Sequence, residues 1–292
     1  MASGTPTNRT NVNLPVDVAG EILAKTQESS AVMQLARKIN LPGRGLAINV
    51  ITGDPEASWI GETAKKPVSN PGLATKIMRG YKLAVIVPFS DEFKRDLSGL
   101  YQELVRRLPN ALGKKFDETV FGKYEAPGSD FDTFAEITAQ SLASGVYDEL
   151  VAADTDVALH KGILNGYAIS PQMRGILLGA KDKNERPLFI GSVAEGQVPT
   201  ILGAKTYLSR ASFVSGSPSV VGIGGDWTQA MWGSVEGVQI AISNEATLDL
   251  GGGQSINLFQ QNMFAVRAEI EVGFRADTSV FNALTATGVP SV

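Results

Sequence analysis

The residues of this sequence that could carry acid–base or nucleophilic chemistry are few. His160 is the single histidine, and the chain has no cysteine. Metal sites with several histidines, thiolate zinc sites and a thiol nucleophile are therefore excluded. His160 could still act as the base for a serine nucleophile, but no Gly-x-Ser-x-Gly turn accompanies it. We interpret His160 as a structural or surface residue and expect no enzyme activity.

Parts of two nucleotide-binding sequence motifs occur in the chain, but neither motif is complete. Gly222-Ile223-Gly224 begins like a dinucleotide-binding loop, but Trp227 stands where the third glycine is needed. Gly113-Lys114 and Gly122-Lys123 begin like phosphate-binding loops, but neither is followed by serine or threonine. Nucleotide binding has no support, and no cofactor is expected.

Two pairs of carboxylates lie two residues apart, Asp130 with Asp132 and Asp154 with Asp156. Such a pair could bind a cation or serve as acid and base. In polar stretches this spacing more often supplies helix caps or solvated loop residues, which is the interpretation that we adopt. No metal site is predicted.

The run Gly251-Gly252-Gly253 could approach a ligand closely. Before a returning strand, such glycines more often form a tight turn, and we predict a turn here. Basic pairs recur along a predicted long helix, where they could contact DNA or an acidic neighbour or form a solvated face: Lys94/Arg95, Arg106/Arg107 and Lys114/Lys115.

The composition is that of a folded, globular chain. Of 292 residues, 43% are hydrophobic and 19% charged, which is too apolar for a disordered protein and long enough for about two domains. The net charge of −4 disfavours dedicated nucleic-acid binding. The N-terminus lacks the apolar core of a signal peptide, and the stretch Leu83 to Phe89 is too short to cross a membrane. We expect synthesis in a cytoplasm.

The first half of the chain reads as an arm, two short helices, strands and a long helix. Residues 1–15 have no apolar periodicity and form the arm, and residues 16–39 show helical spacing with a break near 28–30. Residues 45–87 indicate one hairpin, whose arms of ~15 residues would each span ~50 Å, far beyond a radius of gyration of ~19 Å. Residues 91–123 carry a helical stripe, with a kink, a restart or two separate helices expected at Pro109.

The second half begins with helices and ends in strands. Thr133 and Glu136 match a capping box that predicts a helix continuing to Leu150, and Ser170-Pro171 predicts another helix to about Ala180. From Ile201 onward strands and glycine-rich turns dominate. The clearest strand runs from Phe264 to Phe274 and alternates apolar with charged residues.

The order of these pieces resembles the tailed-bacteriophage major capsid proteins with the Hong Kong 97-type fold. The segments that carry the resemblance are VIVPFSDEFKRDL (85–97), FDETVFG (116–122), ILGA (201–204), IGGDW (223–227) and the late strand followed by residues 277–284. The resemblance covers nearly the whole chain, and its weight lies in the order and spacing of the motifs.

The resemblance implies an α+β fold in six parts. These are an N-terminal arm with leading helices (1–41), an extended β-hairpin loop (42–88), the long spine helix of a peripheral domain (89–129), an axial domain (130–235), the return through the peripheral-domain sheet (236–275), and a C-terminal segment back in the axial domain (276–292).

The resemblance also implies assembly into hexamers and pentamers of an icosahedral head that encloses double-stranded DNA, contacted non-specifically on the inner face. Other implied partners are a portal, a separate scaffolding protein and a decoration protein. No membrane partner is implied. Covalent crosslinking is not predicted, although Lys65, Lys66 and Lys76 lie in the relevant region. The residues expected to contact neighbouring subunits are Arg9, Trp59, Glu62, Lys65, Lys66, Arg79 and Gly252.

Two alternatives remain open at this point. An encapsulin-type bacterial nanocompartment shell would have the same fold but would enclose cargo enzymes. A soluble hydrolase is the alternative from a different class. The expected location is the virion, after assembly in the bacterial host cytoplasm.

Overall fold

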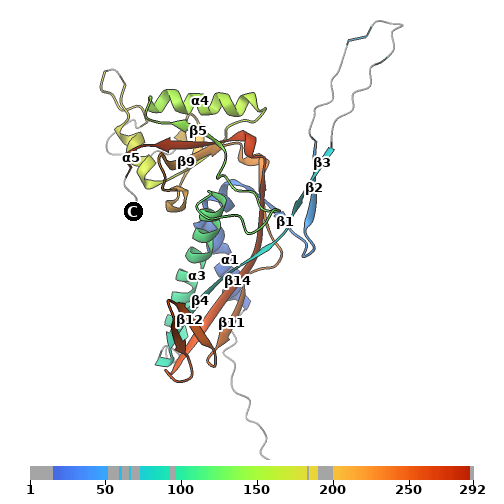
Figure 1. Ribbon diagram of the computed structural model, residues 1–292, viewed down its shortest axis with the longest axis vertical. Coiled ribbons are helices and arrows are strands. Elements are labelled where there is room, and N and C mark those ends of the chain that lie inside the picture. Colours follow the sequence, from blue (N-terminus) through green and yellow to red (C-terminus); the bar gives the residue numbers. More distant parts are fainter. Residues whose placement is uncertain are drawn as a thin grey trace, which may run out of the picture. The chain divides into compact units, whose positions relative to one another are not determined.

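The computed structural model describes residues 16–51, 59–60, 66, 73–92, 97–182, 184–189 and 200–289 (Figure 1). The chain divides into two compact units, each made of three separate segments. Unit 1 comprises Met1–Gln34, Lys82–Asp117 and Glu236–Glu271. Unit 2 comprises Leu35–Tyr81, Glu118–Val235 and Val272–Val292. No helix in the described part of the chain is both long and apolar enough to cross a membrane.

The main helix of unit 1 is α3 (Leu97–Val120). It belongs to unit 1 as far as Asp117, and its last residues, from Glu118, belong to unit 2. Its residues Leu104, Leu108, Leu112 and Phe116 recur at every fourth position and are all buried. This spacing places them in one row along the helix, which is the core-facing stripe that the sequence predicts.

A buried carboxylate on α3 fixes the start of another helix in unit 1. The chain leaves α1 (Val16–Ser29) and enters the short helix α2 (Ala31–Leu35). The Asp117 carboxylate accepts hydrogen bonds from the Ser30 hydroxyl, from Ala31 N at 2.8 Å and from Val32 N at 3.3 Å. The first amides of α2 have no partner within the helix, so Asp117 satisfies them as a side-chain cap would.

The strands of unit 1 form a small sheet. Strand β11 (Gln239–Ser243) pairs antiparallel with residues 265–269 of β14 (Met263–Ala276), and β4 (Tyr81–Ser90) also pairs with β14. The rings of Phe89 and Phe264 stack with centroids 5.6 Å apart. A hairpin of β12 (Thr247–Gly251) and β13 (Gln254–Asn257) turns at three glycines with positive φ, which confirms the predicted turn.

Unit 2 contains a six-stranded sheet with the strand order β5-β15-β9-β6-β8-β7. Strand β15, from the C-terminal part of the chain, lies between β5 and β9, parallel to β5 and antiparallel to β9. The strand bounds are β5 Thr138–Ser141, β6 Gly166–Ile169, β7 Thr200–Ile201, β8 Ala204–Leu208, β9 Ser219–Gly225 and β15 Phe281–Ala286.

Two helices pack on this sheet and share one hydrophobic core with it. Helix α4 (Val146–Leu159) contacts β5, β15 and β9, and α5 (Pro171–Gly179) contacts β9 (Figure 1). The core joins residues of both helices and of the sheet, among them Leu150, Met173, Tyr167 and Leu284. The Ser170 hydroxyl accepts a hydrogen bond from Met173 N at 3.2 Å, so the predicted cap and proline start of α5 are confirmed.

Unit 2 also holds a second strand group and an aromatic cluster. Strand β1 (Arg37–Asn40) runs parallel to β10 (Ala230–Ser234), which pairs antiparallel with residues 272–276 of β14. The Phe134 ring lies 4.6 Å from the Phe281 ring, and both meet the buried Trp227 edge-on.

Two helix predictions are wrong because strand pairing outweighs the local signal. Ile39 lies in β1 and not in a helix, since residues 37–40 pair with β10. The predicted helix after the capping box at Thr133 does not form, because residues 138–141 pair in parallel with β15. Helix α4 begins only at Val146, after Gly145.

The predicted long elements of the first half also need correction. The expected single hairpin over residues 45–87 is shorter, because Lys82–Val87 belong to β4, a strand that pairs with β14. The expected helix start at Asp91 stays a prediction, because β4 runs to Ser90, residues 93–96 lie outside the described residues, and α3 is described from Leu97. Helix α3 continues through Pro109 as one element, so neither a restart nor two separate helices occurs there.

Candidate functional site

Unit 2 also contains a two-stranded hairpin that is separate from its other sheets. Strand β2 (Leu46–Ile51) pairs antiparallel with β3 (Leu73–Met78), in register from Leu46 opposite Met78 to Ile51 opposite Leu73. Among the described strands, neither pairs with any third one. An isolated two-stranded hairpin is marginally stable in water, so contacts at its base matter for its stability.

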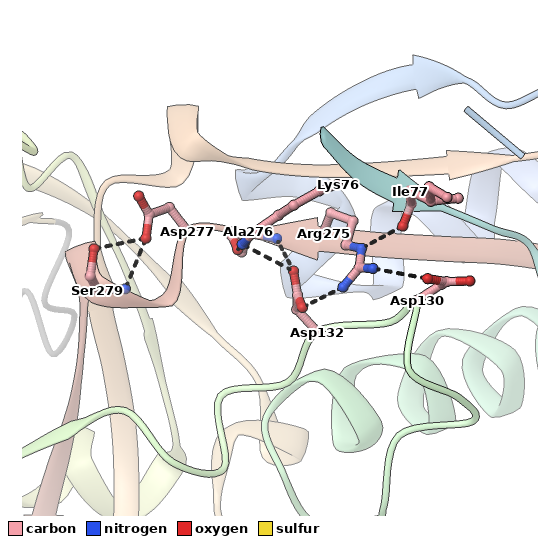
Figure 2. A network of polar contacts seen from close by, with 8 residues as sticks. All are labelled: Lys76, Ile77, Asp130, Asp132, Arg275, Ala276, Asp277 and Ser279. Carbon is pink, nitrogen blue, oxygen red and sulfur yellow. Dashed lines mark hydrogen bonds and ion pairs between the residues drawn. The ribbon is translucent and has the colours of Figure 1, made fainter. Parts of the chain in front are cut away.

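The base of the hairpin is held by Arg275 on β14 (Figure 2). Its guanidinium donates from Nη1 to Asp132 Oδ1 at 2.7 Å, from Nη2 to Asp130 Oδ1 at 3.3 Å and from Nε to the backbone oxygen of Ile77 at 2.8 Å. The guanidinium group therefore joins the end of β3 to the loop that carries both aspartates. The Arg275 side chain is only 11% exposed, which makes these bonds less accessible to water.

Two cations complete the network, Lys76 in β3 and Arg79 directly after it. Lys76 Nζ lies 4.0 Å from Asp132 Oδ2 and donates to the backbone oxygen of Ala276 at 3.2 Å. Arg79 Nε lies 3.3 Å from Asp130 Oδ2. Asp132 Oδ2 also accepts from Ala276 N at 3.0 Å. We call the five charged residues of this network, Lys76, Arg79, Asp130, Asp132 and Arg275, the hairpin anchor.

The charged groups of the hairpin anchor are engaged with one another and with the backbone. Its carboxylates are engaged by arginine, lysine and a backbone amide, and it contains no serine, cysteine or histidine nucleophile or base. Within the described ranges, no cluster of three or more potential ligand side chains could hold a metal ion. The arrangement is that of a rigid joint between the hairpin and its unit.

The structure separates the residues that were predicted to contact neighbouring subunits. Arg9, Glu62 and Lys65 lie outside the described residues. The Trp59 side chain is fully exposed, at 105% of its reference area, and Lys66 is exposed as well.

Of the remaining two candidates, the structure brings only one into the hairpin anchor. Arg79 belongs to it through Asp130. Gly252 lies in unit 1, at the turn between β12 and β13, with φ of 63°. The seven candidates therefore do not form one cluster among the described residues, and their role in subunit contacts stays a prediction.

Sequence reasoning missed the central role of Arg275, Asp130 and Asp132. The aspartate pair was noticed, but as caps or solvated loop residues, whereas both carboxylates hold a largely buried arginine. Arg275 is separated from them by 143 and 145 residues, so no local pattern could join the three. The charge of Arg275 gave no signal either, because charged residues alternate with apolar ones along β14.

The other residues considered for chemistry have structural positions. His160 is exposed at the end of α4, with Nδ1 2.9 Å from the backbone oxygen of Asp156. Asp154 and Asp156 lie within α4 and not in a loop. Gly222 and Gly224 lie in β9, where their missing side chains leave room for Met173 and Tyr167.

Comparisons with known proteins identify the architecture. The sequence model of the phage capsid family matches residues 10–279. The "Probable major capsid protein gp17" of Mycobacterium phage L5 is 31% identical, with 93% of this chain and 89% of that protein covered. The "Major capsid protein" of Staphylococcus phage 80alpha is 26% identical, with 89% of this chain and 81% of that protein covered.

Solved structures agree with the sequence comparison. A chain from Mycobacterium phage Adephagia superposes with a TM-score of 0.72 at 20% identity, covering 90% of this chain and 92% of that chain. A chain from Microbacterium phage Oxtober96 gives 0.71 at 21% identity, covering 98% and 96%. The expected α+β fold of Hong Kong 97-type capsid proteins is confirmed, and the encapsulin alternative is not favoured. The chain belongs to the phage capsid family.

Proposed function

We propose that this capsid protein assembles as hexamers and pentamers into an icosahedral head that encloses double-stranded DNA, and that the hairpin β2–β3 bridges neighbouring copies. The observation that carries the proposal is how the hairpin is attached. At its base Met78 is fully buried and Arg275 binds the backbone of Ile77. The side chains of Ile77 and Lys76, the two residues of β3 before Met78, are exposed.

An exposed hairpin with a rigid base suits contact with another copy of the chain. Its strand edges carry backbone donors and acceptors that a partner can satisfy, and an unpaired edge is otherwise a risk for aggregation. Trp59, in the segment between the two strands, exposes its whole ring, and Ile60 beside it is 38% exposed. Buried aromatic anchors tend to dominate the energy of protein interfaces, so we infer that Trp59 packs against a neighbouring subunit.

The remaining contact residues and partners belong to the same proposal. Arg9, Glu62, Lys65, Lys66, Arg79 and Gly252 are candidates for contacts between copies. The DNA is contacted non-specifically on the inner face, in keeping with a net charge of −4 that gives no basic footprint over the whole surface. A portal, a scaffolding protein and a decoration protein are further partners. The subunit acts by assembly and not by catalysis, and it is made and assembled in the host cytoplasm.

Deleting the segment between the strands tests the role of the hairpin. A variant in which Asn-Gly replaces residues 52–72 keeps both strands and the hairpin anchor, so it should fold and stay soluble. Because the bridging contacts are lost, we expect no closed particles by negative-stain electron microscopy, while circular dichroism and thermal unfolding match the parent chain. Trp59→Ala is the smaller version of the same test. Normal shells from the deletion variant would refute the proposed role.

A further inference from the structure

Helix α4 exposes apolar side chains on the side that faces away from its core. Leu150, Ala153 and Val157 are buried against the sheet. On other sides of the same helix, Tyr147 is 49%, Val151 39% and Leu159 77% exposed, and Ile163 just beyond its end is 77% exposed. A helix on the surface of a monomer usually carries polar residues there, so a further partner surface is indicated.

The same helix is acidic. It carries Asp148, Glu149, Asp154 and Asp156 and no lysine or arginine from Val146 to Leu159. Of these carboxylates, Asp148 and Asp154 are exposed. Lys161 follows the helix, which leaves the surface net acidic. We call five exposed residues of α4, Tyr147, Asp148, Val151, Asp154 and Leu159, the acidic face.

The other end of the six-stranded sheet, at β8 and β7, exposes basic instead of acidic residues. Leu202, in the turn between β7 and β8, is 43% exposed, and Leu208 at the end of β8 is 57% exposed. Lys205 in β8 and Arg210 in the short 3-10 helix η2 (Arg210–Ser212) are exposed at the same end of the sheet. The sequence has no aspartate or glutamate between Thr200 and Ser219. We call Leu202, Lys205, Leu208 and Arg210 the basic edge.

The strand order of unit 2 keeps these two surfaces apart. Helix α4 packs on β5, β15 and β9, whereas β8 and β7 stand at the other end of the order β5-β15-β9-β6-β8-β7. Within one chain the acidic face and the basic edge therefore do not lie on the same strands. Each is left to find its complement on another molecule.

Charge decides which way two copies can meet. A symmetric contact of acidic face with acidic face would bring like charges together, which disfavours that arrangement. A head-to-tail contact pairs carboxylates with Lys205 and Arg210 and buries leucine against leucine and tyrosine. Head-to-tail contacts that close on themselves generate rings.

We propose that the acidic face of one copy packs against the basic edge of the next copy in a ring of this capsid protein. The inference rests on the proposed function, since it assigns the ring contact of the assembling subunit to these two surfaces of unit 2. It makes each subunit contribute two different surfaces, one to each neighbour.

Charge reversal of either surface, and of both together, tests the pairing. The helix variant reverses the acidic face, the edge variant reverses the basic edge, and the combined variant carries all four changes in one chain. A matched control reverses an exposed carboxylate in a turn outside both surfaces. The substitutions are Asp148→Lys with Asp154→Lys, Lys205→Glu with Arg210→Glu, all four together, and Glu185→Lys as the control.

The yield of rings and shells is measured by sedimentation and negative-stain microscopy, with circular dichroism and thermal unfolding to establish that each chain is folded. We expect the helix and edge variants each to lose assembly by about tenfold or more in low salt, and the combined variant to recover it. A folded single-surface variant that assembles like the control would overturn the inference, as would a folded combined variant that fails to recover. If the parent chain itself forms no particles, the proposed function fails instead.

Discussion

Arg275 carries more of the stability of unit 2 than a surface arginine would. It is 11% exposed, and its partners Asp130 and Asp132 are 22% and 19% exposed. Replacing it by alanine leaves two poorly solvated carboxylates and frees the backbone oxygen of Ile77. We expect Arg275→Ala to lower the free energy of unfolding by about 2–4 kcal/mol, measured by urea denaturation.

A matched control lies on the same strand. Arg267 pairs with Glu269 at 2.6 Å, but its side chain is 52% exposed. Because water solvates that pair, Arg267→Ala should change the free energy of unfolding by no more than about 0.5 kcal/mol. Equal losses of unfolding free energy for the two variants would mean that the hairpin anchor stabilises the fold no more than an exposed ion pair does.

Tyr167 places a buried hydroxyl in the core without a hydrogen-bond partner among the described residues. Burial raises the pKa of this phenol well above its ordinary value of 10.0, and the nearby Asp154 adds to the rise. A raised pKa in the folded state means that stability is fully present below about pH 10 and falls as the pH rises further.

Removing that hydroxyl should therefore not lower the free energy of unfolding at neutral pH. We expect Tyr167→Phe to be as stable as the parent or more stable by up to about 1 kcal/mol, and to lose less stability above pH 10. Part of the alkaline loss should remain, because the hydrogen bond to Glu118 also raises the pKa of Lys123. Denaturation curves at neutral and alkaline pH test both points, and a marked destabilisation at pH 7 would count against them.

Strand β9 shows why its glycines are needed. A Cβ on Gly224 would lie 2.5 Å from a ring carbon of Tyr167, which is too close for any relaxed packing. Gly224→Ala should lower the free energy of unfolding by about 1–3 kcal/mol, as overpacked cores do. Gly237→Ala is the control, since nothing lies within 4 Å of the added atom there. Similar thermal unfolding of the two variants would contradict this account of Gly224 in β9.

Elements with strong local signals could be predicted from the sequence, and those that depend on distant pairing could not. Ser170 and Pro171 gave the start of α5, and the alternation from Phe264 to Phe274 gave most of β14. The capping box at Thr133 failed because residues 138–141 pair with Asn282–Thr285, more than a hundred residues away. The same reason hid the hairpin anchor, whose aspartates and arginine meet only in the fold.

The two units differ in what they need from outside the chain. Each has its own buried core and is assembled from three separated segments, so neither can complete itself before the C-terminal part of the chain is made. Exposed apolar side chains remain on the hairpin, on α4 and on the β7–β8 edge. A subunit with several such surfaces is built for association, in agreement with its membership of the phage capsid family.

The central claim is that this chain forms a closed shell with copies of itself. Negative-stain electron microscopy of the purified, expressed protein tests it most directly, because a shell is seen without any assumption about which residues make the contacts. We predict closed particles of uniform diameter. A population of single folded subunits that remains monomeric at high concentration would contradict the account.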